Sequence, residues 1–348
     1  MPDTAPIRPE EQFDEVVVAA YLREHLPALF NCDDIRFDQF PGGAANLTYR
    51  AWCPGAGEYV LRRAPLGDVA RGGHDMAREH QVLSRLWRRF PLAPRAFHYC
   101  SDPEIMGKPF FVMERRKGHV VRREWPKALA NDSAKRTVVA HSLVDALADL
   151  HSVNPSDVNL EDLGKADGFV DRQIHGWSGR WAAAATRPVP EMETVSRLLA
   201  ENAPTPQRVT ILHNDYKLDN TMIDDTGHLV AVFDWDMATL GDPLVDAGTL
   251  LAYWAQPDDP TYAVFGANAV AIGEVMPKDE VRLRYAERSG LDLDQIDFYE
   301  ALALFRIAVI IEQIFARYVA GQTSDERFAS FEPIAPLLAS AAIRTLEY

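Results

Sequence analysis

One stretch of the 348-residue chain gathers side chains that could do chemistry between two apolar ends. Residues 211–224 read ILHNDYKLDNTMID, in which Asp215, Lys217 and Asn220 are the candidates for a reaction. Carboxylate and amide oxygens at this density suit a metal ion beside a reacting hydroxyl. The alternative is an ordinary solvated turn. The elements on either side of this stretch distinguish the reactive site from the turn.

The segment after Asn220 predicts a hairpin with polar residues at its open end. Asn220 precedes an outgoing strand, residues 224–227 read DDTG and supply a turn, and Asp234 ends the returning strand. Antiparallel pairing would place Asp234 beside Asn220, since opposed residues have Cα atoms roughly 4.5–5.5 Å apart. Two oxygen ligands backed by waters suit Mg²⁺ better than zinc or calcium. Taken singly, Asp215, Asp219 and Asp234 could equally be turn-forming or capping acids.

Residues 1–117 alternate strand and turn signals, and then a helix pattern follows. The loops PGGAAN and PGAG separate three runs that predict a three-stranded antiparallel meander. We expect strands at 34–40, 47–53 and 58–64, a helix at 74–90 and a further strand at 109–114. The polar stretch after Gly118 is typical of a hinge.

From about residue 134 the pattern becomes mainly helical, apart from short strands between 208 and 234. We predict helices at 134–153, 191–202, 243–255, 279–289, 297–320 and 333–346. The fold class is therefore α+β, with a sheet-rich N-lobe at 1–117 and a helical C-lobe at 118–348.

Composition excludes some classes of function. With 47% hydrophobic and 25% charged residues the chain is an ordinary globular protein. Of its 36 basic and 51 acidic residues, 16 of each lie in 1–117, so the net charge of −15 belongs to 118–348. This acidity argues against binding of nucleic acid or of anionic membranes. It is compatible with cationic substrates or with a solvated acidic surface.

The three cysteines, Cys32, Cys53 and Cys100, are odd in number and lack CxxC spacing. We therefore expect no disulfide and no structural zinc, as in a reducing compartment. The first residues show no export signal, and charged residues such as Arg306 interrupt the longest apolar helix candidate. These observations predict a cytoplasmic protein.

Two loops resemble those of a known family. His213-x-Asp215-x₄-Asn220, followed by a hairpin and Asp234-Trp235-Asp236, resembles the catalytic and metal-binding loops of kinase-like phosphotransferases. The chain is most similar to the aminoglycoside phosphotransferase-like family, which includes choline and homoserine kinase relatives. Within it, HNDYKLDN and FDWDMATLGDPLVDAG look most like the kinase-like domain fused to some acyl-CoA dehydrogenases. The resemblance covers residue 38 to the C-terminus and implies a bilobal protein-kinase-like fold.

The resemblance also implies roles for the loop residues. Asp215 would orient the acceptor hydroxyl and take its proton, Asn220 and Asp234 would bind Mg²⁺ on the phosphates of ATP or GTP, and His213 would brace the loop. The family usually has glycine where this chain has Asn214. Asparagine fits there with a negative φ, and it also tolerates the left-handed region.

Lys217 projects from the same loop and has two interpretations. It could neutralise the transferring phosphoryl group, or it could be a simple surface charge.

The first lobe offers residues that could hold a nucleotide. The loop with Gly42, Gly43 and Asn46 lies where a kinase covers the phosphates, although an ordinary hairpin turn explains it as well. On the next strand Val60 and Arg62 share a face, and Arg62 stands where kinases have a lysine.

Helix 74–90 provides an independent check on Arg62. Glu79 falls on the apolar stripe of this helix and needs a partner, which Arg62 could provide; the alternative is that Glu79 reaches solvent. The hinge strand would offer backbone groups to the base. The full set expected to bind the nucleotide is Gly42, Gly43, Asn46, Val60, Arg62, Glu79, Met113, Glu114 and Arg115.

The leading function is a Mg²⁺-dependent small-molecule kinase that acts on a hydroxyl. The competitors are a non-catalytic ligand-binding module of the same fold and a metal-dependent hydrolase, which would need further metal ligands. For the acceptor, the resemblance suggests a hydroxyacyl-CoA, ranked slightly ahead of an amino sugar or amino alcohol. No pattern predicts the oligomeric state.

Overall fold

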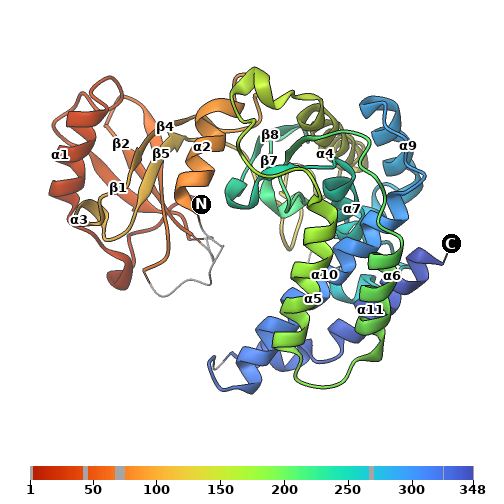
Figure 1. Cartoon of the computed structure of the whole chain (residues 1–348). Coiled ribbons are helices and arrows are strands. Elements are labelled where there is room, and N and C mark those ends of the chain that lie inside the picture. The colour runs from red at the N-terminus through yellow and green to blue at the C-terminus, as the bar shows by residue number, and fades with distance from the viewer. Residues whose placement is uncertain (1–2, 42–45, 67–74, 266–269, 324, 348) are drawn as a thin grey trace. The chain divides into compact units, whose positions relative to one another are not determined.

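The computed structural model describes residues 3–41, 46–66, 75–265, 270–323 and 325–347. Its contacts divide the chain into two compact units (Figure 1). Unit 1 takes Met1–Lys117, Val158–Leu160 and Val230–Ala238, and unit 2 takes Gly118–Asp157, Glu161–Leu229 and Thr239–Tyr348. We describe each unit by itself, and the functional lobes at 1–117 and 118–348 stay a prediction.

Unit 1 is built on a five-stranded antiparallel sheet. The strands are β1 (Arg36–Gln39), β2 (Leu47–Trp52), β3 (Glu58–Arg63), β4 (Ala96–Cys100) and β5 (Phe110–Glu114). They lie in the order β1-β2-β3-β5-β4, and each neighbouring pair is antiparallel. The predicted meander is confirmed as β1–β3 and the predicted strand at 109–114 as β5, whereas β4 was not anticipated.

Alternation along the strands gives the sheet two covered faces. On one face Tyr49, Leu61 and Val112 form a core with Val18 and Leu22 of helix α1 (Glu15–His25). Helix α2 (Met76–Leu86) packs on β4 and β5, and it begins after Asp75, whose side chain accepts a hydrogen bond from the Arg78 N–H. A short helix, α3 (Pro103–Met106), precedes β5.

A disulfide joins Cys32 to Cys53, so the expectation of no disulfide is wrong. The two cysteines are 21 residues apart and have Cα atoms separated by 6.1 Å. Strand pairing explains the proximity, because Arg36 at the start of β1 pairs with Trp52 at the end of β2. The sequence spacing carried no sign of this pairing. Cys100 is a buried free thiol.

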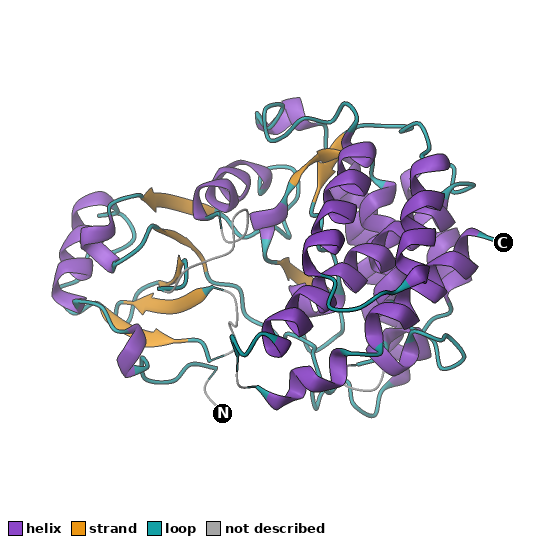
Figure 2. Cartoon of the chain, turned by 60° about the horizontal axis from the view of Figure 1, so that its bottom comes forward, coloured by secondary structure: helices purple, strands orange, loops and turns teal. Residues whose placement is uncertain are grey.

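Unit 2 is mainly helical, as Figure 2 shows by its colouring. The six predicted helices are confirmed within two residues at each end, and the 16-residue helix α5 was not anticipated. The helices are α4 (Ser133–Ser152), α5 (Phe169–Ala184), α6 (Pro190–Glu201), α7 (Leu244–Tyr253), α8 (Tyr262–Phe265), α9 (Lys278–Ser289), α10 (Ile296–Val319) and α11 (Ile334–Leu346).

Helix α10 forms the centre of unit 2 and packs against α5, α6, α7 and α11. It lies against α7 at Gly248. A Cβ atom at that position would lie 2.7 Å from the Glu300 backbone nitrogen, which is closer than real Cβ contacts allow. The absence of a side chain therefore lets the two helix backbones touch.

Short strands also lie between the helices along the chain. Strands β6 (Thr210–Leu212) and β9 (Thr239–Gly241) pair antiparallel, and β7 (Thr221–Ile223) pairs with β8 (Leu229–Val232). The turn at Asp224 closes with Gly227 at φ 95°, which confirms the predicted hairpin. Across the described residues, no helix is long and apolar enough to cross a membrane.

Candidate active site

Residues 213–220, which we call the catalytic loop, leave β6 and end in a 3₁₀ helix, Leu218–Asn220, before β7. His213 is fully buried and its Nδ1 accepts a hydrogen bond of 3.3 Å from the Asp215 N–H. Tyr216 is also buried, and its hydroxyl donates to the Leu143 carbonyl of α4 at 2.8 Å. The loop therefore turns two of its side chains into the core while Asp215 stays partly exposed.

A buried carboxylate on α7 fixes the start of the loop. Asp246 accepts the backbone N–H groups of His213 at 2.6 Å and Asn214 at 2.7 Å. His151 of α4 lies with its Nε2 3.3 Å from the same carboxylate, and its Nδ1 is 2.6 Å from the Tyr285 hydroxyl. Burial alone would raise the pKa of Asp246, but these hydrogen bonds and the imidazole charges hold it below its ordinary value.

Asn214 adopts the left-handed conformation, with φ 68°. Of the two backbone states expected for asparagine, the structure has the left-handed one and not the negative φ. Arg306 of α10 stabilises it, because its Nη2 donates to the Asn214 carbonyl at 3.0 Å and to the side-chain Oδ1 at 2.8 Å. The Arg306 guanidinium also lies 5.6 Å from the ring centre of Trp177 on α5. A glycine would adopt this φ but could not offer Oδ1.

Asp215, Lys217 and Asn220 lie together in the loop. Lys217 Nζ is 2.7 Å from each carboxylate oxygen of Asp215, and Asn220 Nδ2 donates to Oδ2 at 2.8 Å. The Lys217 ammonium also lies 5.1 Å from the ring centre of Tyr253. Burial alone would lower the pKa of Lys217, but the acidic groups around it, first Tyr253 and then Asp215, raise it. The ammonium therefore stays charged beside a partly exposed carboxylate.

A second group of charges lies in unit 1, and we call it the Arg62 cluster: Arg62, Glu79 and Asp234. Arg62 Nε donates to Glu79 Oε2 at 2.8 Å, and Nη2 forms an ion pair with Asp234. The expected partnership of Arg62 with Glu79 is thus present, and the alternative in which Glu79 reaches solvent is wrong because its side chain is 1% exposed.

The Arg62 cluster has more acids than cations. Burial alone would lower the pKa of Arg62, but Glu79, Asp234 and then Asp236 raise it. Burial also raises the pKa of Glu79 to about 7, against the opposing charge of Arg62. The Arg62 guanidinium thus stays charged while it pairs with two carboxyl groups, those of Glu79 and Asp234.

Local contacts place Asp234 within unit 1. The Val232 N–H donates to the Leu92 carbonyl at 2.8 Å, and Arg78 Nη1 donates to the Ala238 carbonyl at 2.9 Å. Trp235 is fully buried and packs edge-on against Phe90. Asp234 itself has φ 68°, which turns the chain from β8 into a 3₁₀ helix, Trp235–Met237.

The other predicted nucleotide-binding residues have varied surroundings. Gly42 and Gly43 lie outside the described residues, and Asn46, Val60 and Met113 are buried.

Strand β5 is hydrogen-bonded to its neighbour at its C-terminal end. The Glu114 N–H donates to the Arg95 carbonyl at 2.8 Å, so this backbone donor is already engaged. Arg115 forms ion pairs with Asp3 and Glu58. Neither contact assigns these residues to a nucleotide.

Asn220 and Asp234, the two predicted metal ligands, each keep a side-chain oxygen that could bind a cation. Asn220 uses its amide nitrogen for both contacts with Asp215, which leaves Oδ1 for a cation. Asp234 accepts the Arg62 ion pair through Oδ1 and keeps its second oxygen. Hard oxygen ligands of this kind suit Mg²⁺. Asn220 belongs to unit 2 and Asp234 to unit 1. Within the described parts of the chain, no three His, Cys, Asp or Glu side chains gather as a metal site.

Sequence reasoning missed Asp246 and Arg306. Both are charged residues within apolar helical runs, LVDAG and ALFRIAV. A buried charge requires a partner, and that signal could have led to the catalytic loop.

Comparison with known proteins gives a consistent set of matches. A sequence model of the phosphotransferase enzyme family matches residues 36–284. Acyl-CoA dehydrogenase family member 11 of Rattus norvegicus is 30% identical over 344 residues, which covers 96% of this chain and 44% of that protein. The chain thus spans less than half the length of this relative.

Solved structures give the same fold. A putative aminoglycoside phosphotransferase from Ralstonia eutropha JMP134 has a TM-score of 0.79 and 27% identity, covering 96% of this chain and 99% of its own. An aminoglycoside phosphotransferase in ternary complex with AMP-PNP and hygromycin B has a TM-score of 0.60 and 16% identity, covering 94% and 98%. This second likeness shows the fold alone.

Proposed function

Because the chain belongs to the phosphotransferase enzyme family, we propose that it is a Mg²⁺-dependent small-molecule kinase. It transfers the γ-phosphoryl group of ATP or GTP to a hydroxyl of its substrate. The observation that carries the proposal is the Asp215 carboxylate, partly exposed and held between Lys217 and Asn220. A carboxylate fixed in this way can position a hydroxyl and accept its proton.

The catalytic loop supplies the groups that transfer requires. The acceptor oxygen forms a bond to the γ-phosphorus while the bond to the β–γ bridging oxygen breaks, and the nucleoside diphosphate leaves with the electron pair. Asp215 takes the hydroxyl proton. Lys217, charged and next to Asp215, offsets negative charge on the moving phosphoryl group. Little covalent chemistry is left for the protein, so catalysis is positioning and electrostatics.

Arg62 would bind phosphate oxygens while Glu79 fixes its orientation. Asn220 and Asp234 would provide oxygen ligands for Mg²⁺, which neutralises the phosphates when bound.

For the acceptor we propose a hydroxyacyl-CoA. A relative with 30% identity carries the name of an acyl-CoA dehydrogenase family member, and the charges around Asp215 support an oxygen-rich acceptor. Lys217 is one such cation, and Arg306 is another whose buried Nη1 has no hydrogen-bond partner among the described residues. An amino sugar or amino alcohol would bring a further positive charge to these two.

Replacement of Asp215 tests the reaction. Asp215→Ala should lower turnover by about a hundredfold or more, because it removes the group that accepts the proton, while nucleotide binding measured by calorimetry stays near the wild-type value. Asp225→Ala is the matched control, since Asp225 is an exposed acid in the hairpin turn that pairs with His119. Near wild-type turnover in Asp215→Ala would refute the assigned role.

A substrate screen tests the acceptor. Hydroxyacyl-CoAs, aminoglycosides and amino alcohols are each incubated with ATP or GTP, and mass spectrometry looks for a phosphorylated product. We expect product with a hydroxyacyl-CoA and none in the absence of an acceptor. Release of phosphate without any acceptor would indicate a hydrolase, and nucleotide binding with no product in any mixture would indicate a binding module.

A further inference from the structure

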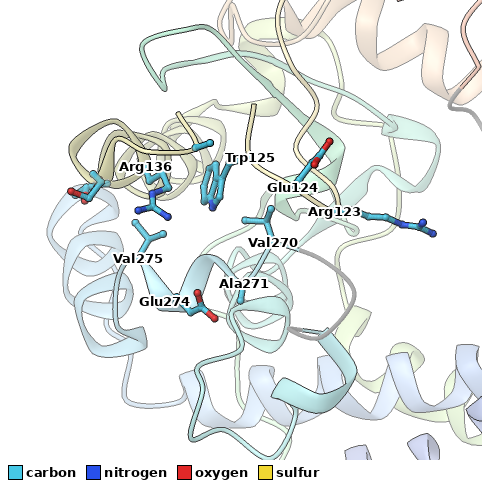
Figure 3. A pocket seen from close by; sticks show the side chains of 11 residues that line it. Arg123, Glu124, Trp125, Arg136, Val270, Ala271, Glu274 and Val275 are labelled. Atoms are coloured by element: carbon cyan, nitrogen blue, oxygen red, sulfur yellow. The ribbon is translucent and has the colours of Figure 1, made fainter. Parts of the chain in front are cut away.

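Unit 2 contains a cavity of about 650 Å³ that the proposed reaction does not use. Its walls come from residues 123–125, from the first turn of α4 and from residues 270–275 (Figure 3). The volume falls in the usual range for small-molecule sites, roughly 300–1,000 Å³. Val270 donates its N–H to the Arg122 carbonyl at 2.8 Å, which ties two of the walls together.

Arg136 provides a cation without a partner in this cavity. Its Nε is buried and has no hydrogen-bond partner among the described residues, and no ion pair to its guanidinium occurs there. A buried donor left unpaired is costly unless a ligand satisfies it. Arg136 stands in the first turn of the 20-residue helix α4, where the helix dipole adds positive potential. The cavity therefore favours an anionic group at this end.

Trp125 gives the cavity a flat apolar surface. Figure 3 shows Trp125 on the cavity wall together with Arg136, Val270 and Val275, all of which line the cavity. Aromatic faces of this kind stack on nucleobases. The ligand should thus combine a planar ring with an anion.

Among the residues that the structure describes, neither acid of the cavity wall, Glu124 or Glu274, forms an ion pair with Arg136. In Figure 3, Glu124 points away from the guanidinium, as does the neighbouring Arg123. Glu274 accepts a hydrogen bond from the Tyr262 hydroxyl.

We propose that this cavity binds a purine nucleotide phosphate, with the base stacked on Trp125 and the phosphate bound by Arg136. Such a group has two sources. One is the nucleotide end of a CoA-ester acceptor, an assignment that rests on the proposed function, and the other is a free nucleotide.

Binding measurements on the full chain test the site. Calorimetry with CoA, adenosine 3′,5′-bisphosphate and AMP is compared between wild type, Trp125→Ala and Arg136→Gln. We expect each change to weaken binding of at least one of these probes about tenfold, with thermal melting unchanged. Arg123→Gln is the control, since that guanidinium points away, and it should alter binding less than twofold. Wild-type affinity for all three probes in both test variants would overturn the proposal.

Kinetics separate the two sources. If the nucleotide belongs to the acceptor, Trp125→Ala and Arg136→Gln raise the KM for a hydroxyacyl-CoA about tenfold and leave the KM for ATP unchanged. If it is a free nucleotide, AMP or the bisphosphate loses affinity while the acceptor KM stays constant. Binding that depends on Trp125 and Arg136, in a chain that phosphorylates no acceptor, would refute the proposed kinase and still support this site.

Discussion

The catalytic loop and the Arg62 cluster hold their acids in opposite ways. In the loop, one buried carboxylate, Asp246, receives donors from two backbone N–H groups and a histidine. In the cluster, one guanidinium is paired with two carboxyl groups, those of Glu79 and Asp234. A buried carboxylate with all its hydrogen-bond donors in place, such as Asp246, fixes the backbone around it. An excess of acids over cations, as around Arg62, favours binding of a further cation. The first region therefore fixes the backbone of the catalytic loop, and the second has one more acid than cation.

Asp246→Ala should have the largest effect on stability, because it removes the carboxylate that holds the start of the catalytic loop. The change leaves His151 and the N–H groups of His213 and Asn214 without their acceptor. We expect a loss of about 3–5 kcal/mol in the free energy of unfolding, as for a broken buried charge network, measured by urea denaturation.

Asp145→Ala serves as the control for Asp246→Ala. Asp145 is an acid of α4 that pairs with Arg284 in a partly exposed position, and such pairs contribute about 1 kcal/mol or less. An equal loss of unfolding free energy in the two variants would mean that Asp246 stabilises the loop no more than a surface acid does.

For the Arg62 cluster, the test is how the contribution of Glu79 to the unfolding free energy depends on pH. Its pKa is about 7 in the folded chain and about 4.3 in an unfolded one. The folded state therefore binds a proton on Glu79 that the unfolded state has already released. The resulting stabilisation is complete below about pH 4.3 and is lost as the pH rises through 7. We expect the unfolding free energy of wild type, relative to Glu79→Gln, to fall between pH 5 and 8 in urea titrations. A difference that is constant with pH would show that Glu79 is ionised throughout.

Asn214→Gly should give the smallest effect. Glycine keeps the left-handed conformation and loses only the Oδ1 contact with Arg306, since the backbone carbonyl contact remains. We expect a cost of about 1 kcal/mol and a modest loss of turnover.

Asn214→Ala should cost about 1–2 kcal/mol more than Asn214→Gly, because alanine strains at this φ. Thermal melting of the two variants checks the order, and a more stable alanine variant would contradict it.

Residues whose contacts follow local periodicity could be predicted from sequence. The pair Arg62–Glu79 followed from strand alternation and a helix stripe, and the hairpin followed from its turn residues. The family resemblance carried by HNDYKLDN is confirmed by the match over residues 36–284, as is the kinase-like fold by the solved structures. The roles of Asp215, Asn220 and Asp234 stay proposals.

Contacts that depend on packing between distant segments could not be predicted. The Cys32–Cys53 disulfide needs the register of β1 with β2, and the hold of Arg306 on Asn214 needs α10 to lie beside the loop. Strand β4 was missed because it is short, and helix α5 because its apolar and polar residues are mixed. Hydrophobic periodicity does not distinguish such segments from loops.

The contact of α7 with α10 at Gly248 has a consequence for the loop. Asp246 lies two residues before Gly248 on α7, and Arg306 extends from α10 to Asn214. The helices that carry Asp246 and Arg306 are therefore packed directly against each other. Gly248 thus helps to align the proposed catalytic base, Asp215, although it lies in the core. A side chain at this position would separate the two helices, and we expect its effect to be measured as a loss of turnover.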